Sequence, residues 1–242
     1  MTSPYVIEDS NVSYAWVKAL NKILESPGNE ITPLLLTLTN FEESPDIRAA
    51  LDLNLTKSKL ASIQTVSETI FPKSLYQLCG QNRSKLYEQY LRNMPRIRKI
   101  DTSNANGTYF ERMIAFNGSH LKINQLEIII SSIESKNVKR RSKLQASIFD
   151  PRIDHTNKPF QGFPCLQHVT FFVSENNGLI LNSFYAVQYL YRRGYGNWLG
   201  LINLGKFVAN ELNMDFERFN CYIGVEKLEI TKSKAHKLLK NK

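Results

Sequence analysis

A cysteine and an asparagine stand out in this sequence as side chains that could act on a bound molecule. Cys165 follows Pro164 at the start of a strand-like segment, and Asn197 opens a long helical segment about thirty residues later. A cysteine thiolate is strongly nucleophilic near neutral pH and can form and later break a covalent bond with a substrate. An asparagine amide both donates and accepts hydrogen bonds, which suits it to bind an amide-like ring edge. The alternatives are a small buried residue at Cys165 and a plain helix cap at Asn197.

The other residues of this kind form no comparable pattern. Cys79 and Cys221 have no motif around them, and the chain has no CxxC metal pair. No GxGxxG or GxxxxGK phosphate loop occurs. Four histidines lack the spacing of metal ligands, so we expect no bound metal. They are His120, His155, His168 and His236.

Several short segments occur in the order and at the spacing of one known family. They are Gly107–Arg112 (GTYFER), Gln125-Leu126, Ser147–Pro151 (SIFDP), and Pro164-Cys165 followed by Asn197. Over roughly residues 105–229 the chain therefore resembles the thymidylate synthase superfamily. The resemblance implies an α+β fold of three layers: a curved mixed sheet with helices on one face and a homodimer interface on the other.

The resemblance also implies a covalent mechanism. Cys165 would add to C6 of a pyrimidine and make C5 a nucleophile toward the one-carbon unit of 5,10-methylenetetrahydrofolate, a folate cofactor. Asn197 would donate to O4 and accept from N3–H of the ring, and Tyr109 would join a proton network near the reacting carbon. An arginine close to the thiol would lower its pKa. Tyr109 could equally be a half-buried aromatic residue on a helix flank.

Positions that bind the phosphate and sugar in the family differ in this chain. Aligned without gaps from Asn197, Ala186 and Tyr189 replace a phosphate-binding arginine and an aspartate, and Glu226 replaces a sugar-binding histidine. Each lost arginine–phosphate contact removes a charge-assisted hydrogen bond of ~1.5–3 kcal/mol, so ordinary deoxyuridylate (dUMP) is not the expected substrate. The family's proton-relaying glutamate has no counterpart either, and Glu68 is only the nearest by position.

Two arginine pairs could replace these contacts. Arg140-Arg141 resemble paired arginines that reach across the family dimer, although they lie about two residues too far upstream. Arg192 and Arg193 directly precede the Gly194–Asn197 segment and could meet a phosphate from another direction, or they could belong to a solvated basic loop. The first hypothesis is thus a diverged pyrimidine C5 methyltransferase or hydroxymethyltransferase acting on a pyrimidine base, nucleoside or nucleotide. The second is a catalytically inactive relative that binds a nucleotide or a protein partner.

These residues must be positioned by one continuous domain, which we expect over residues 1–230, followed by a solvated basic tail over 231–242. Asn11 is the expected N-cap of a first helix that ends before Pro27-Gly28. The segment 195–212 is expected as a strongly amphipathic helix across the sheet. Hydrophobic spacing and turn residues further predict helices over 46–53, 57–70, 75–93 and 125–135, and strands over 34–39, 144–149, 165–173, 179–185 and 219–228.

Composition limits the class of protein. The chain has 242 residues, 42% of them hydrophobic, with 31 Lys+Arg against 22 Asp+Glu, a net charge of +9. Much of the excess lies in 136–143, in Arg192-Arg193 and in the tail. Without a zinc motif, an RNP sequence or a helix-turn-helix signature, nucleic-acid binding is not the favoured explanation. Without a membrane-length apolar run, a signal sequence or a disulfide framework, we expect a cytoplasmic protein with no membrane contact.

Overall fold

The fold is built on one mixed β-sheet. The computed structural model describes residues 3–100, 102–118, 121–135, 140–157 and 164–240. The seven-stranded sheet has the order β1 (Tyr5–Asn11), β3 (Leu34–Glu42), β9 (Phe216–Lys227), β8 (Leu179–Tyr189), β7 (Leu166–Val173) and β6 (Gln145–Ser147), with β2 (Glu30–Ile31) also paired to β9. β1 is parallel to β3 and β8 to β9, whereas the remaining pairs are antiparallel. The predicted α+β class with a mixed sheet is confirmed. A short second sheet pairs β4 (Phe116–Asn117) with β5 (Lys122–Ile123).

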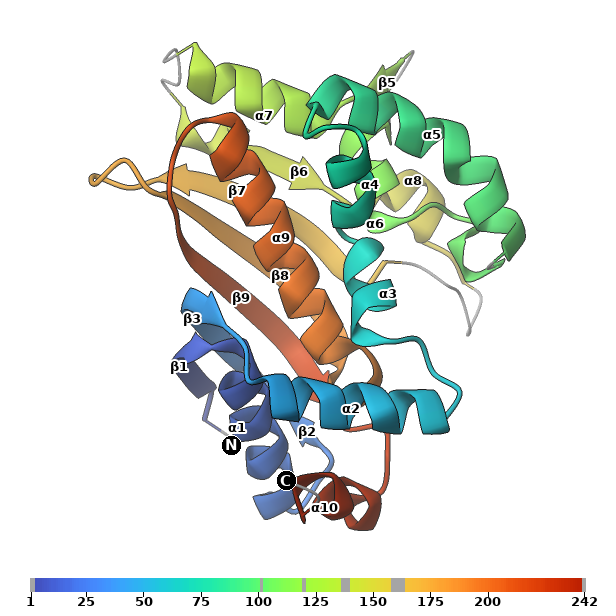
Figure 1. The fold of residues 1–242 in the computed structure, drawn as a ribbon, viewed down its shortest axis with the longest axis vertical. Coiled ribbons are helices and arrows are strands. Elements are labelled where there is room, and N and C mark those ends of the chain that lie inside the picture. Colours follow the sequence, from blue (N-terminus) through green and yellow to red (C-terminus); the bar gives the residue numbers. More distant parts are fainter. Residues whose placement is uncertain (1–2, 101, 119–120, 136–139, 158–163, 241–242) are drawn as a thin grey trace.

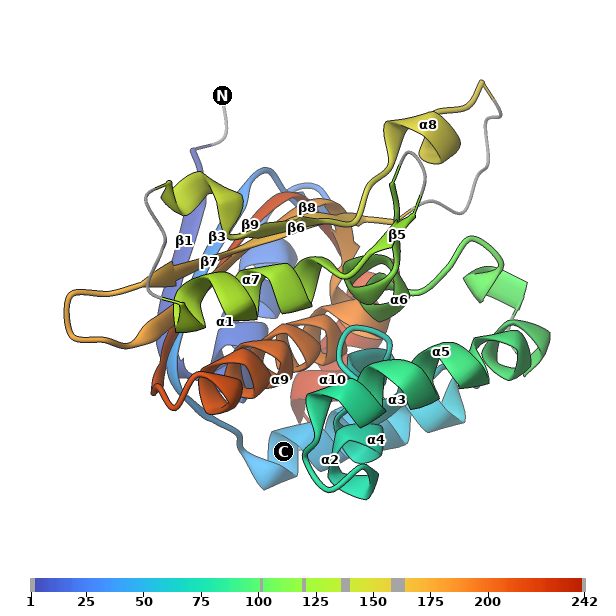
Figure 2. The same cartoon turned by 90° about the horizontal axis from the view of Figure 1, so that it is seen from above.

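Three helices lie on the same side of this sheet: α1 (Val12–Glu25), α7 (Gln125–Glu134) and α9 (Tyr195–Glu211) (Figure 1, Figure 2). Every residue of α9 from Tyr195 to Gly205 is buried. The prediction of a strongly amphipathic helix was therefore wrong for this segment. Its outer side is covered as well, because α1 and α3 (Ile63–Glu68) pack against it.

The helices of the first hundred residues agree with the sequence in part. The Asn11 side chain accepts hydrogen bonds from the backbone N–H groups of Ser13 and Tyr14, so the predicted N-cap is confirmed. The predicted helix over 57–70 is wrong, since α2 (Pro45–Lys57) ends where it should begin and only the short α3 follows. The predicted helix over 75–93 is divided into α4 (Lys73–Leu78) and α5 (Arg83–Ile100).

The break between α4 and α5 has a backbone cause. Gly80 and Gln81 both take left-handed conformations, with φ of 65° and 56°, which a continuous right-handed helix does not allow. α5 then continues through Pro95, where we expected it to stop. Proline removes only one backbone donor, and the flanking turns of this 18-residue helix remain.

The end of the described chain is a helix packed on the domain. In α10 (Lys232–Lys240) Ala235 is fully buried and Leu238 is nearly so, and the helix contacts α1. Lys232 Nζ also donates to the Leu24 carbonyl. This corrects the expectation of a solvated tail for these residues, because two apolar side chains one turn apart suffice to anchor the helix. Within the described residues, no helix has the length and apolarity needed to cross a bilayer.

The sheet face turned away from α9 carries two rows of partly exposed side chains. His168, Phe184 and Tyr222 are neighbours on β7, β8 and β9, and Tyr222 is 46% exposed. Beside them, a row of polar side chains is linked by hydrogen bonds of 2.8–3.3 Å across four strands. It consists of Thr37, Asn220, Asn182 and Thr170. None of α1, α7 and α9 lies on this face (Figure 2).

The alternation of inward-facing and outward-facing side chains slips by one residue near the ends of β8 and β9. Tyr185 and its partner Ile223 face the helices, and the next fully buried pair, Gln188 and Glu226, follows three residues later instead of two. Strand side chains normally alternate with a period of two, so the backbone shifts its phase at the same height in both strands. As a result two polar side chains are buried beneath the start of α9.

Candidate active site

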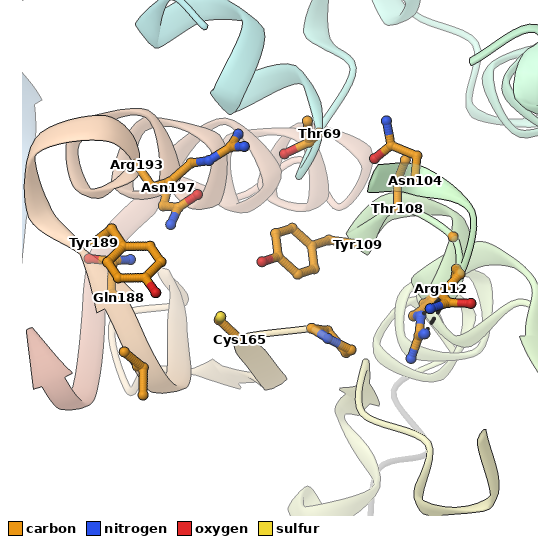
Figure 3. A pocket seen from close by; sticks show the side chains of 14 residues that line it. Thr69, Asn104, Thr108, Tyr109, Arg112, Cys165, Gln188, Tyr189, Arg193 and Asn197 are labelled. Atoms are coloured by element: carbon orange, nitrogen blue, oxygen red, sulfur yellow. Dashed lines mark hydrogen bonds between the residues drawn. The ribbon is translucent and has the colours of Figure 1, made fainter. Parts of the chain in front are cut away.

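A cavity of about 260 Å³ lies where β7 begins, β8 ends and α9 begins (Figure 3). Cys165 lines it from the residue before β7, and Tyr109 from the first residue of α6 (Tyr109–Ile114). Arg193 and Asn197 line it from the start of α9 and the turn before it. The structure thus brings together four residues that the sequence singled out from separate segments.

The other predicted arginines lie elsewhere in the described chain. Arg192 does not line the cavity: its Nε lies 3.3 Å from Glu229 Oε1, and its guanidinium stacks on Tyr189. Arg141 stacks on Phe172 at the far end of β7 from Cys165, and Arg140 is exposed beside it. Within one chain neither reaches the cavity. The first four residues of the basic segment 136–143 lie outside the described residues.

The backbone of Cys165 is held by its neighbours. Its carbonyl accepts hydrogen bonds from the Ala186 backbone N–H at 3.1 Å and from Gln167 Nε2 at 3.3 Å. Burial raises the pKa of the Cys165 thiol, and the nearby Arg193 charge opposes that rise. Because burial is the larger effect, the free protein favours the thiol over the thiolate. The sequence-based expectation of an arginine near the thiol is met, but this arginine alone does not activate it.

Tyr109 is the second polar group beside the thiol. Burial, followed by the Cys165 charge, raises the pKa of its phenol to about 12. Arg193 and the backbone amides of Leu166 and Cys165 act in the opposite direction. The phenol therefore stays protonated at neutral pH, where it can donate a hydrogen bond but cannot act as a strong base.

Asn197 lies inside the first turn of α9, after a π-helical turn at Leu190–Gly194, and does not occupy the N-cap position. Its side chain is buried, yet it makes no hydrogen bond to any described residue. Gly196 allows α3 to pack directly against this turn, since a Cβ there would lie 2.6 Å from Val66 Cβ. The helix start is thus fixed in place while the Asn197 amide is free for a ligand.

Arg112 is the other arginine on the cavity wall, and its charge is compensated. Its two terminal nitrogens bind both carboxylate oxygens of Asp154, at the end of α8 (Pro151–Asp154). It also donates to the carbonyls of Ile148 and Asn106 at 2.8 and 2.9 Å. Among the described lining residues, Arg193 is therefore the one guanidinium without a carboxylate partner.

Most of the remaining wall consists of neutral polar side chains that sequence reasoning passed over. Gln188 is the most informative, because it is a buried polar residue that directly follows the largely apolar run 184–187 in β8, and that contrast is visible in the sequence. The others lie in loops and at helix ends, and of these only Thr108 belongs to a segment that the sequence singled out, the GTYFER segment, without itself being chosen. They are Thr69, Asn104, Asn106 and Thr108. Glu68, weighed earlier as a proton relay, is not in the wall and accepts hydrogen bonds from Gln64 and Ser74.

The described residues include no group of three or more His, Cys, Asp or Glu side chains placed to hold a metal ion. What the cavity presents is a thiol, a neutral phenol, one guanidinium without a carboxylate partner, and four side-chain amides. This set can attack an electrophilic ring carbon and bind a ring through hydrogen bonds. No family model matches the sequence, and no curated protein matches it significantly.

Proposed function

We propose that the protein is a diverged pyrimidine C5 one-carbon transferase with Cys165 as its nucleophile. One observation carries this proposal: Cys165, Tyr109, Asn197 and Arg193 line a single cavity although they come from three separate segments. The resemblance to thymidylate synthases selects Cys165, Tyr109 and Asn197, and Arg193 is one of the arginines that could replace the phosphate contacts missing from the family pattern. The proposed fold is accordingly the three-layer type of that family.

The proposed reaction begins with the Cys165 thiolate. Its sulfur forms a bond to C6 of the pyrimidine, and the electrons of the C5–C6 double bond move through C4 onto O4. The Asn197 N–H stabilises the negative charge on O4, and the neutral Tyr109 phenol can donate a hydrogen bond nearby. C5 would then bond to the one-carbon unit that the folate supplies when bound; the bond between that carbon and the folate nitrogen would break, and a hydride from the reduced folate or a water would complete the methyl or hydroxymethyl group. Loss of the C5 proton and departure of the Cys165 thiolate re-form the C5–C6 double bond.

The thiolate must form while ligand is bound, because burial favours the thiol in the free protein. Arg193 is the group in the described wall that can stabilise it. A homodimer through the open sheet face would add further charge if Arg140 and Arg141 of one copy approached the cavity of the other. Sedimentation tests this: we expect a dimer at micromolar concentration, converted to monomer by Tyr222→Glu, and a wild-type monomer would contradict it.

The one-carbon donor proposed is 5,10-methylenetetrahydrofolate. The cavity, at about 260 Å³, is slightly smaller than typical small-molecule sites of ~300–1,000 Å³ and suits a pyrimidine with its sugar. It does not also fit a folate, so no step is assigned to residues that would bind one. Dependence of adduct formation on the folate is left to the experiment.

Mass spectrometry after incubation with 5-fluoropyrimidine bases, nucleosides and nucleotides tests the chemistry. Fluorine at C5 cannot leave as a proton does, so the covalent species should accumulate on Cys165 in the presence of methylenetetrahydrofolate. Cys165→Ser is the matched control and should form no adduct. Absence of a Cys165 adduct with every compound would reject the transferase.

The thiol environment also supports a second candidate, a non-catalytic binder of a nucleotide or protein partner. Burial raises the Cys165 pKa. Ala186 and Tyr189 stand where the family has charged residues, and Tyr189 lines the cavity. In that case Cys165→Ser binds pyrimidine nucleosides as tightly as the wild type and keeps the biological activity. Both candidates disfavour dUMP, because the wall has few free positive charges for a phosphate.

A further inference from the structure

Gln188 is a buried polar side chain in the cavity wall with an unused donor. The residue is 2% exposed and lines the cavity, and its Nε2 makes no hydrogen bond. A buried amide donor without a partner costs stability, so such groups in a folded protein usually have an explanation. In Figure 3 Gln188 lies at the same end of the cavity as Asn197, away from Arg112.

The orientation of the Gln188 amide is fixed by Trp198. The indole Nε1 donates to Gln188 Oε1 at 2.9 Å, and both residues are buried. An indole N–H can only donate, so it must face the amide oxygen. Rotating the amide by 180° would set the Gln188 NH₂ against this N–H. Gln188 therefore presents its NH₂ end to its other surroundings.

Glu226, on the paired strand, does not take up this donor. Its carboxylate oxygens are also without a hydrogen-bond partner, and a Cβ built on Gly194 would lie 3.7 Å from Glu226 Oε1 and 3.6 Å from Gln188 Oε1. The Gln188 oxygen and the acid thus lie close to the backbone of the turn that precedes Asn197. The donor that no protein group satisfies is thus Gln188 Nε2, on a side chain that lines the cavity.

Asn197 differs from Gln188 in this respect. No described residue binds its amide, so it can turn either end toward a ring. Facing uracil, its oxygen would accept from N3–H and its nitrogen would donate to O4. Facing cytosine, the flipped amide would donate to N3 and accept from the exocyclic amine. Asn197 alone therefore accommodates both rings.

We propose that Gln188, locked by Trp198, is the specificity-determining residue of this site and selects a ring carbonyl over a ring amine. The inference rests on the proposed pyrimidine site and adds which ring it takes. The locked NH₂ donates to a carbonyl oxygen of a uracil-type ring. Against the amine of a cytosine-type ring, donor would face donor, and both would lose their hydrogen bonds to water. Trp198 acts as a positioning residue through Gln188.

Equilibrium dialysis with deoxyuridine and deoxycytidine tests this, since the two probes share the sugar and differ in the ring. We expect the wild type to prefer deoxyuridine by at least tenfold, the ratio that one unmade hydrogen bond to a buried donor produces. Gln188→Met, of similar size but without polar atoms, should weaken deoxyuridine binding about tenfold and leave deoxycytidine little changed. Gln145→Met, on the exposed edge strand β6, is the matched control and should bind like the wild type.

Trp198→Phe provides a second variant that keeps Gln188. It removes the N–H that orients the amide, so the Gln188 amide can flip and the preference should fall below threefold while both nucleosides still bind. A wild type that binds both nucleosides equally would overturn the inference and leave the proposed site intact. A preference unchanged in Gln188→Met would do the same. A wild type that binds neither would reject the pyrimidine site and the inference together.

Discussion

Changing Asp154 to asparagine should destabilise the protein more than most single substitutions. The Asp154 carboxylate accepts hydrogen bonds from both terminal nitrogens of Arg112 and from the backbone N–H of Asp150. The Asp154 side chain is 1% exposed and that of Arg112 is 8% exposed. Asparagine has the same shape, but its NH₂ would face a donor. The change therefore leaves a buried guanidinium without its counter-charge and disturbs few other contacts.

The size of the effect follows from burial. Removing one partner of a buried ion pair typically costs ~3–5 kcal/mol, because the remaining charge stays desolvated. Arg112→Met should cost a similar amount, since it strands Asp154 and removes donors from the carbonyls of Ile148 and Asn106. The double variant contains no unpaired charge. Its cost should be smaller than the sum of the two by about 2–3 kcal/mol.

Urea unfolding followed by tryptophan fluorescence measures this cycle, because both tryptophans, Trp16 and Trp198, are buried. Additivity within about 0.5 kcal/mol would refute the reasoning, since it would mean that Arg112 and Asp154 are solvated independently. The Arg112–Asp154 pair also joins α6 to α8, and Asp154 precedes Cys165 by eleven residues in the chain. Asp154→Asn should therefore increase the alkylation rate of Cys165 as this part of the wall loosens.

Three further predictions concern Glu226, Gly196 and Arg193. Burial raises the pKa of Glu226 far above that of an unfolded chain, so the folded protein retains a proton that the unfolded chain loses as the pH rises above ~4.3. The free energy of unfolding should therefore fall as the pH rises in the wild type but not in Glu226→Gln, and urea unfolding midpoints measured from pH 4.5 to 8 test this. If the midpoints of the two proteins changed with pH in parallel, the prediction would be contradicted. Gly196→Ala should cost about 1–3 kcal/mol through its contact with α3, whereas Gly28→Ala, with open space around it, should change the midpoint little; equal effects would refute the packing argument. Arg193→Met should shift the pH profile of Cys165 alkylation to higher pH, because it removes the charge that opposes burial; an unchanged profile would mean that Arg193 does not act on the thiol.

The sequence predicted local features whose cause is local. The Asn11 cap depends on an amide and the next few backbone N–H groups, and the strand after Cys165 depends on the pattern of its own residues. The predicted amphipathic character of α9 was wrong, because the outer face of this helix is covered by segments that lie far away in the sequence. The same applies to α10, where burial of Ala235 depends on α1.

The candidate site was predictable to a similar degree. Cys165 and Asn197 stand next to recognisable segment starts, so their positions could be anticipated. Gln188 could not be assigned a role, because its orientation depends on Trp198 and its burial on the phase change in β8 and β9. Neutralisation of the Arg112 charge likewise depends on Asp154, which is 42 residues away in the chain.

Because β8 and β9 slip in their alternation at the same height, a change in the length of one strand at that place requires the same change in the other. A one-residue deletion in β8 alone, placed between Tyr185 and Gln188, would restore simple alternation there while β9 kept its shift. Gln188 would then no longer match Glu226 across the ladder. In related sequences we therefore expect insertions and deletions at these two places to occur together, so that gaps in an alignment would reveal the pairing of the strands even where the residues themselves have diverged.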